Sequence, residues 1–178
     1  MGFPELETKR LKLVQLGEEH IPGFYDIMSR DEVTKYYGME SLKNLEEAAR
    51  IIESFRTNFE NKRAVRWGIL LKDTEDFAGT VGLNNLHVRG KRAEIGYELH
   101  PSHWNKGITT EAVKEVLRYA FEELDLFRMG AVTFTENKTS IQLLKRLGFK
   151  EEGILRGYLF QNNQSHDGLV FSLLKTEW

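Results

Sequence analysis

The sequence predicts an α/β protein with one mixed, mostly antiparallel sheet flanked by helices. Segments whose apolar residues recur at i, i+3, i+4 and i+7 predict helices with one buried face. Other segments alternate apolar and polar residues, which is the pattern of a strand. A helix separates the strand at residues 93–99 from the strand at residues 129–135. This βαβ unit predicts one parallel pair joined by a right-handed crossover.

The first third of the chain predicts one strand followed by two helices. Residues 6–16 alternate as a strand, and residues 18–30 have the apolar spacing of a helix. A second helix is predicted over residues 45–61. Asn44 can cap its first turn together with Glu47, in a variant of the capping box.

Three strands and a helix are predicted in the middle of the chain. Strands at residues 66–72 and 77–86 flank a hairpin turn, and with residues 93–99 they form an antiparallel meander. Gly96, inside the last strand, predicts a bulge or a close approach of another group to the backbone. The helix that follows has its buried face at Val113, Val116, Leu117, Ala120, Phe121 and Leu124.

The C-terminal part predicts a last helix and a hairpin. The helix runs from Asn137 to Gly148, which is the expected left-handed position at its C-terminal end. Thr139 and Gln142 satisfy a capping box, and Asn137 offers an alternative start. Strands are predicted at residues 129–135, 153–161 and 168–174, the last two joined across Asn162 and Asn163.

Composition excludes several classes of protein. We expect a single domain over residues 1–178, a length that can bury a substantial core. The net charge of −2 gives no general attraction to nucleic acid or anionic membranes. Without cysteine the chain has no disulfide, thiol nucleophile or cysteine metal site. No apolar run approaches the roughly 20 residues of a membrane span, and the N-terminus lacks the apolar core of a signal peptide, so a cytoplasmic protein is expected.

The polar loop before the long helix is a candidate anion site. Its consecutive backbone N–H groups can face outward, Lys106 adds positive charge, and the helix N-terminus adds a partial positive charge. This arrangement predicts a site for a phosphate or pyrophosphate. The alternative is an ordinary turn in which Thr109 or Thr110 caps the helix. The loop consists of Asn105, Lys106, Gly107, Ile108, Thr109 and Thr110.

Four segments resemble, in order, the GNAT superfamily of N-acetyltransferases: AEIGYEL from Ala93, WNKGITTEAV from Trp104, YAFEELDLFRMGA from Tyr119 and ENKTSIQLLKRLGFKEEGILRG from Glu136. More narrowly, the chain is similar to the branch that acetylates the N-terminal residue of ribosomal proteins. The resemblance implies acetyl-CoA as co-substrate and a slot for its arm between two parallel strands that splay at their ends. The loop departs from the family pattern Q/R-x-x-G-x-G/A, because Trp104 and Thr109 occupy its first and last positions.

The resemblance also implies roles around the slot. A backbone N–H near Leu99, with Glu98 beside it, would polarise the thioester carbonyl. Asn137 would bind the pantetheine arm, and Ser140 would protonate the coenzyme A thiolate. Asn137 and Ser140 are also good helix-start residues that need no catalytic role. Tyr158 is a weaker alternative for the acid.

Two carboxylates are candidates for the base. Glu94 and Glu98 are four residues apart in a strand, so they share one face. A carboxylate beside the slot could take the amine proton directly or through water. The alternative is that both are ordinary strand residues that face solvent. An α-amino group, with a pKa of about 7.7–8.0, is deprotonated more easily by such a base than a lysine side chain, with a pKa of about 10.4.

The predicted activity is direct transfer of acetyl from acetyl-CoA to a primary amine in a ternary complex. In the resembling family the segment over residues 31–41 borders the acceptor pocket, so Tyr36 and Tyr37 are candidate substrate residues together with Glu94. They could equally cover the edge of the core. His100 and His103 have no third ligand nearby in the sequence, so no metal is expected.

The favoured acceptor is the N-terminal α-amino group of a ribosomal or other protein. A small amine such as a polyamine, an amino acid or an aminoglycoside is the alternative, and Asp31, Glu32 and Glu40 leave a polycation open. A non-catalytic acyl-CoA-binding module is the rival from another class. The resemblance also makes a homodimer an expectation.

Overall fold

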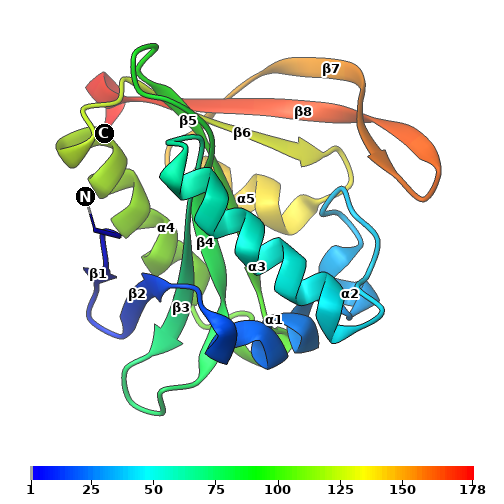
Figure 1. Cartoon of the computed structure of the whole chain (residues 1–178). Helices are drawn as coiled ribbons and strands as arrows, with labels where there is room; N and C mark the ends of the chain where they lie inside the picture. The colour runs from blue at the N-terminus through cyan, green and yellow to red at the C-terminus, as the bar shows by residue number, and fades with distance from the viewer. Residues whose placement is uncertain (1) are drawn as a thin grey trace.

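The computed structural model describes residues 2–178, which form an eight-stranded sheet with helices on both faces (Figure 1). The strands lie in the order β1-β2-β3-β4-β5-β6-β8-β7, and every neighbouring pair is antiparallel except β5 and β6. The predicted α/β class with a mixed, mostly antiparallel sheet is therefore confirmed. Within this described part of the chain, no helix is long and apolar enough to cross a membrane.

The N-terminal elements differ from the prediction in two places: the first strand is divided, and the short helix α2 lies in a segment for which no helix was predicted. The single strand expected at residues 6–16 is two strands, because the chain turns at Thr8, whose N–H donates to the Leu11 carbonyl at 2.9 Å. The second predicted helix is confirmed, and Asn44 Oδ1 caps it by accepting the Glu47 N–H at 2.9 Å. The elements of this region are β1 (Leu6–Glu7), β2 (Leu11–Gln15), a 3-10 turn (Glu18–His20), α1 (Ile21–Met28), α2 (Asp31–Thr34) and α3 (Leu45–Glu60).

Helices cover the sheet in two layers. One face carries α1 and α3, and the core there is formed by residues such as Phe24, Ile27 and Ile52. The other face carries α4 (Ile108–Arg118) and α5 (Lys138–Arg146), which pack on the larger core cluster (Figure 1). We call these the α1–α3 face and the α4–α5 face.

The meander of β3 (Val65–Leu71), β4 (Phe77–His87) and β5 (Arg92–Leu99) is confirmed. The bulge considered at Gly96 is absent, because β4 and β5 stay in register from Gly79↔Leu99 to Asn84↔Glu94. The glycine instead permits a close approach: a Cβ there would lie 2.6 Å from Asn84 Nδ2 and 2.9 Å from Arg66 Nη1. Gly96 therefore leaves room for the ends of these two side chains.

The parallel pair splays. β5 and β6 (Arg128–Phe134) pair only at Arg92↔Arg128, Ala93↔Met129 and Glu94↔Gly130. Beyond Glu94 the strands part, while β6 continues to pair with β8 as far as Phe134. We call the gap bordered by residues 95–99 and 131–134 the fork.

Of the two helices beside the fork, α4 starts earlier than a cap at Thr109 or Thr110 would place it, and α5 starts at the predicted alternative, Asn137. Gly107, with a φ of 73°, is the N-cap of α4, so neither Thr109 nor Thr110 caps it. α5 uses the alternative start: Asn137 Oδ1 accepts the Ser140 N–H at 3.3 Å, and the Thr139–Gln142 box is not used. In both cases the backbone turns into the helix ahead of the threonine.

The C-terminal hairpin is confirmed and longer than predicted. β7 (Lys150–Gln161) and β8 (Gln164–Leu174) meet at Asn162 and Asn163, whose φ values of 54° and 57° are those of a tight hairpin turn. The hairpin reaches beyond the rest of the sheet, and its tip lies beside the segment that contains α2 (Figure 1). The hairpin tip, near the C-terminus, therefore contacts the N-terminal segment that follows α2.

Candidate functional site

The fork presents backbone groups that have no strand partner. The His100 N–H donates to the Ala78 carbonyl at 2.7 Å, so His100 faces β4. Because backbone groups alternate along a strand, those of Tyr97 and Leu99 face away from β4, toward the fork. The Leu99 carbonyl accepts from the Trp104 indole at 2.9 Å, which leaves the Leu99 N–H for a ligand. These backbone groups lack a strand partner because β6 diverges from β5 beyond Glu94. The sequence had suggested a different cause, a local irregularity within β5.

The predicted phosphate loop has the backbone of an anion site. Asn105 and Gly107 both have left-handed φ values, 60° and 73°, so the chain turns sharply before α4. Ile108 is buried, which leaves its N–H as the part that can face a ligand, and Lys106 is exposed. The loop thus keeps N–H donors and a cation at the N-terminus of α4.

An arginine from the N-terminal hairpin holds this loop. Arg10 Nη1 donates to the Lys106 carbonyl at 2.9 Å, and Arg10 Nε pairs with Glu111 at 2.6 Å. Thr8 also donates to Glu111, at 2.6 Å. Partial burial acts to raise the pKa of Glu111, but the hydrogen bonds from Thr8 and Arg10 prevail and hold the pKa below its usual value. Arg10 and Glu111 therefore link the N-terminal hairpin to the loop before α4 and stabilise its conformation. The sequence did not indicate this role.

Two hydroxyl groups meet on the α4–α5 face of the fork, and a third lies on the same face. Ser140, predicted as the acid, is 8% exposed, and its Oγ is hydrogen-bonded to the Tyr97 hydroxyl. Thr133, on β6, is also buried, and its Oγ1 has no hydrogen-bond partner among residues 2–178. Buried hydroxyls are usually paired, so this one indicates a polar ligand in the fork. The amide and hydroxyl groups of a pantetheine arm fit such a lining.

Glu98 lies on the opposite, α1–α3 face and is not available to a ligand. It is 6% exposed, and its two oxygens are bound by Arg66 and by Thr80. Arg66 Nη2 also donates to the Tyr37 hydroxyl at 2.7 Å. The structure therefore gives no support to Glu98 as a base or a cofactor contact, and Tyr37 belongs to this buried cluster.

Glu94 lies at the closed end of the fork. Its Oε2 accepts from Asn85 Nδ2 at 3.1 Å, and its side chain is partly exposed beside Gly130. Five residues of strand separate it from Leu99, which is about 17 Å. The Glu94 carboxylate therefore lies too far from Leu99 to take a proton directly from an amine bound beside the Leu99 N–H.

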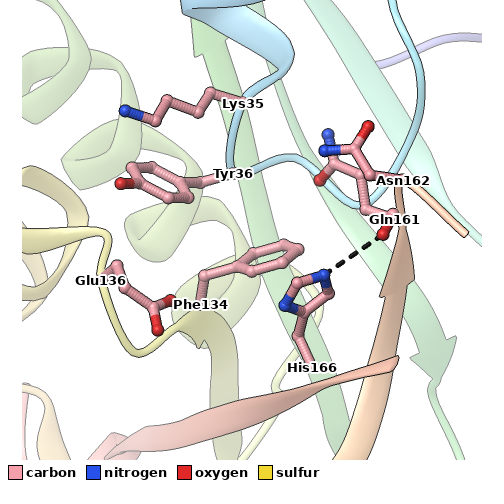
Figure 2. Close-up of a pocket in the computed structure, with 7 residues that line it drawn as sticks. All are labelled: Lys35, Tyr36, Phe134, Glu136, Gln161, Asn162 and His166. Atoms are coloured by element: carbon pink, nitrogen blue, oxygen red, sulfur yellow. Dashed lines mark hydrogen bonds between the residues drawn. The ribbon is translucent and has the colours of Figure 1, made fainter. Parts of the chain in front are cut away.

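A cavity of about 250 Å³ lies at the open end of the fork, on the α1–α3 face. Figure 2 shows its aromatic lining: the Phe134 ring centroid is 5.9 Å from that of Tyr36 and 5.3 Å from that of His166. Lys35 and Glu136 add one positive and one negative charge on the same side of the cavity (Figure 2). Of the two predicted acceptor tyrosines, Tyr36 lines this cavity and Tyr37 does not.

Gln161 joins the two walls of the cavity. Its Nε2 donates to the carbonyls of Thr34 at 2.7 Å and Met39 at 3.0 Å, and its Oε1 accepts the Gly38 N–H at 3.0 Å. The side chain is 5% exposed. The sequence gave no signal for this residue, because its partners lie more than 120 positions away.

The acidic residues considered for a polycation are engaged elsewhere. Asp31 accepts from Ser41 Oγ at 2.6 Å, and Glu40 accepts the Asn162 N–H at 2.9 Å. Glu32 lies 3.8 Å from Arg30. Within residues 2–178 no cluster of three or more His, Cys, Asp or Glu side chains could hold a metal ion.

A mixed sheet whose parallel strands part in this way is the arrangement that the sequence resemblance implied for an acyl-CoA-dependent transferase. The family model described as an acetyltransferase (GNAT) domain matches residues 10–150. The chain is 43% identical to the uncharacterized N-acetyltransferase YoaA of Bacillus subtilis (strain 168), over 97% of this chain and 98% of that protein. The protein therefore belongs to the GNAT family of acetyltransferases. It is an N-acetyltransferase that uses acetyl-CoA. The alternative hypothesis, a non-catalytic acyl-CoA-binding module, is therefore rejected.

Other relatives act on different acceptors. The chain is 30% identical to the [ribosomal protein uS5]-alanine N-acetyltransferase of Escherichia coli (strain K12), over 65% of this chain and 60% of that protein. Two solved structures that contain coenzyme A share the fold. One is RimL, a ribosomal L7/L12 α-N-protein acetyltransferase, with a TM-score of 0.85 and 19% identity over 98% of this chain and 100% of that one. The other is a spermidine N-acetyltransferase of Vibrio cholerae with spermine, with a TM-score of 0.83 and 20% identity over 96% and 98%.

Proposed function

We propose that this enzyme acetylates the N-terminal α-amino group of a peptide or protein, ribosomal proteins first, by direct transfer in a ternary complex. The observation that carries the proposal is that the donor and acceptor elements lie on opposite faces of one fork. The loop at Gly107 and the hydroxyl of Ser140 belong to the α4–α5 face, and the cavity at Phe134 belongs to the other. An amine and a thioester can thus meet through the fork with no covalent enzyme intermediate.

The cavity supports a peptide N-terminus over a polycation. A volume of about 250 Å³ suits one amino-acid residue. Three aromatic rings provide an apolar surface for its side chain, and Glu136 is the one carboxylate among the lining residues. The positive charge of Lys35 offsets the negative charge of Glu136. Binding of a polyamine would require several carboxylates without a neighbouring positive charge.

In this proposal the chain's own groups have separate tasks. The fork-facing N–H of Leu99 or Tyr97 polarises the acetyl carbonyl, and Ser140 donates to the departing sulfur. Asn137 keeps its amide nitrogen for the pantetheine arm, because its Oδ1 is used by the Ser140 N–H. Glu94 accepts the amine proton through a chain of water molecules, since its distance from Leu99 excludes direct contact. The remaining ligands are the loop residues Asn105, Lys106, Gly107, Ile108, Thr109 and Thr110, which hold the phosphates.

The ribosomal acceptor is supported by the uS5-alanine enzyme among the relatives. The RimL and spermidine enzymes share only the fold at their low identities, so they do not decide between a protein and a small amine. The proposal places the reaction in the cytoplasm, where new protein N-termini arise.

A panel of acceptors tests the proposal. The purified enzyme with acetyl-CoA is given peptides that begin with Ala, Ser or Met, together with spermidine, spermine and free amino acids, and products are located by mass spectrometry. We expect acetylation of peptide α-amines at least tenfold faster than of the polyamines. Preference for a polyamine or a free amino acid would overturn the peptide assignment.

A charge variant locates the acceptor. Glu136→Gln should raise the acceptor KM about tenfold and leave the acetyl-CoA KM unchanged, because it removes the carboxylate that faces an ammonium in the cavity. Glu151→Gln is the matched control, since this exposed residue lies on β7 away from the cavity. Equal effects of the two variants would show that the amine binds elsewhere.

We also propose a homodimer, supported by the exposed apolar residues of the edge strand β7. Ile154, Tyr158 and Phe160 are 57%, 54% and 62% exposed. An apolar edge strand of this kind usually has a partner. Light scattering on the eluting protein gives the mass, and a monomer at micromolar concentration would contradict this part of the proposal.

A further inference from the structure

We propose that Tyr97 is a positioning residue for acetyl transfer: its hydroxyl holds that of Ser140 in the orientation that donates a hydrogen bond to the coenzyme A sulfur. The inference rests on the proposed function, because it takes Ser140 as the group that meets the departing sulfur. Tyr97 lies in the segment AEIGYEL that carries the family resemblance, but the sequence gave it no role.

Tyr97 is placed by the splay of the strands. It lies three residues beyond Glu94, the last residue of β5 that pairs with β6. Its side chain lies on the α4–α5 face, where the hydroxyl reaches Ser140 Oγ at the start of α5. Ser140 is thus held twice, by Asn137 through its backbone N–H and by Tyr97 through its hydroxyl.

Proton chemistry gives this hydrogen bond a direction. Each hydroxyl has one hydrogen and two acceptor lone pairs. A phenol is a stronger acid than an aliphatic alcohol, so Tyr97 donates and Ser140 accepts. The hydrogen of Ser140 is then free for another acceptor. Burial raises the pKa of Tyr97 to about 12, so the phenol keeps its hydrogen throughout the neutral pH range.

The surroundings of the pair favour a ligand over simple packing. Ser140 is 8% exposed and Thr133, on the same face of the fork, has a buried Oγ1 with no partner in residues 2–178. A hydroxyl left unpaired in a protein interior costs stability unless something binds it. A thiolate with a pKa of about 8.5, as for a cysteine thiol, is the acceptor that the free Ser140 hydrogen would serve.

Binding of coenzyme A itself tests this orientation without any turnover. A hydrogen bond from Ser140 stabilises the thiolate form, so affinity for coenzyme A should rise between pH 7 and pH 9.5 relative to desulfo-coenzyme A, which lacks the sulfur. We expect this relative gain to be about tenfold in the wild type and to be lost in Tyr97→Phe and in Ser140→Ala. Tyr119→Phe is the matched control: Tyr119 is also buried, and no hydrogen bond of its hydroxyl is found in the described residues.

Steady-state rates give the second readout. Tyr97→Phe should lower kcat about tenfold and change the KM for acetyl-CoA less than twofold, because the ring and its packing remain. The double variant Tyr97→Phe/Ser140→Ala should be no slower than Ser140→Ala alone, since Tyr97 acts through Ser140.

Three outcomes would overturn the inference. The pH-dependent gain could persist in Tyr97→Phe, or be absent from the wild type, or the two substitutions could multiply in kcat. A wild-type enzyme that acetylates none of the offered peptides would refute the proposed acceptor, whereas the coenzyme A titration would still decide the role of Tyr97.

Discussion

The buried pair of Arg66 and Glu98 gives a quantitative prediction. Replacing Glu98 by leucine leaves the Arg66 guanidinium, 4% exposed, without its counter-charge in the interior. Removing one partner of such a pair costs about 3–5 kcal/mol of the free energy of unfolding. For a chain of 178 residues this loss corresponds to a fall of about 8–13 °C in Tm.

Urea unfolding followed by tryptophan fluorescence measures the loss, because Trp67 is buried beside Arg66 on β3. The control is the double variant Arg66→Met/Glu98→Leu, which removes both charges. It should recover most of the stability, to within about 1–2 kcal/mol of the wild type.

The reasoning fails if the single variant loses less than about 1 kcal/mol, since the charge of Arg66 would then have access to water. It fails equally if the double variant is as unstable as the single one. In that case lost packing, and not the uncompensated charge, would account for the effect.

Three further changes test other parts of the site. Gln161→Leu removes three hydrogen bonds between the cavity walls. It should therefore raise the acceptor KM about tenfold and leave the acetyl-CoA KM unchanged. Equal changes in both KM values would contradict this role. Gly107→Ala should cost about 1–2 kcal/mol in urea unfolding, because its φ of 73° is left-handed, and calorimetry should show weaker acetyl-CoA binding; an unaffected affinity would exclude the loop as the phosphate site. Glu111→Gln should cost about 1 kcal/mol at pH 7. The folded-state pKa of Glu111 lies below its ordinary value of 4.5, so the stabilisation is complete above pH 4.5 and disappears as the pH falls through the lowered pKa. A difference between wild type and variant that persists at pH 2 would refute this explanation.

The elements of the fold were largely predictable, because each depends on local pattern. The helix over Leu45–Glu60, its Asn44 cap and the hairpin at Asn162 follow from apolar period and from turn residues a few positions apart. The starts of α4 and α5 were not, because threonines that could cap compete with Gly107 and Asn137. The backbone conformation of the loop decided between them.

The candidate site was predictable in part. The loop at Gly107 and Ser140 came from the sequence and the family resemblance, and both border the fork. Glu98 was misjudged, because a period of two placed it on one face with Glu94 but gave no sign that Arg66 would bind it. The partner comes from another strand, 32 positions earlier.

By itself the sequence determined most of the strands and helices in their order and the parallel crossover, and it predicted the anion loop, since all of these arise from residues close together in the chain. Only the tertiary structure decided where β5 and β6 part, which hydroxyls meet across the fork, and which side chains close the cavity. Tyr97 and Ser140 are 43 positions apart, and Gln161 and Thr34 are 127 apart. Contacts over such separations exist only after the sheet has formed, because packing and hydrogen bonding in the folded chain select them and no local pattern encodes them.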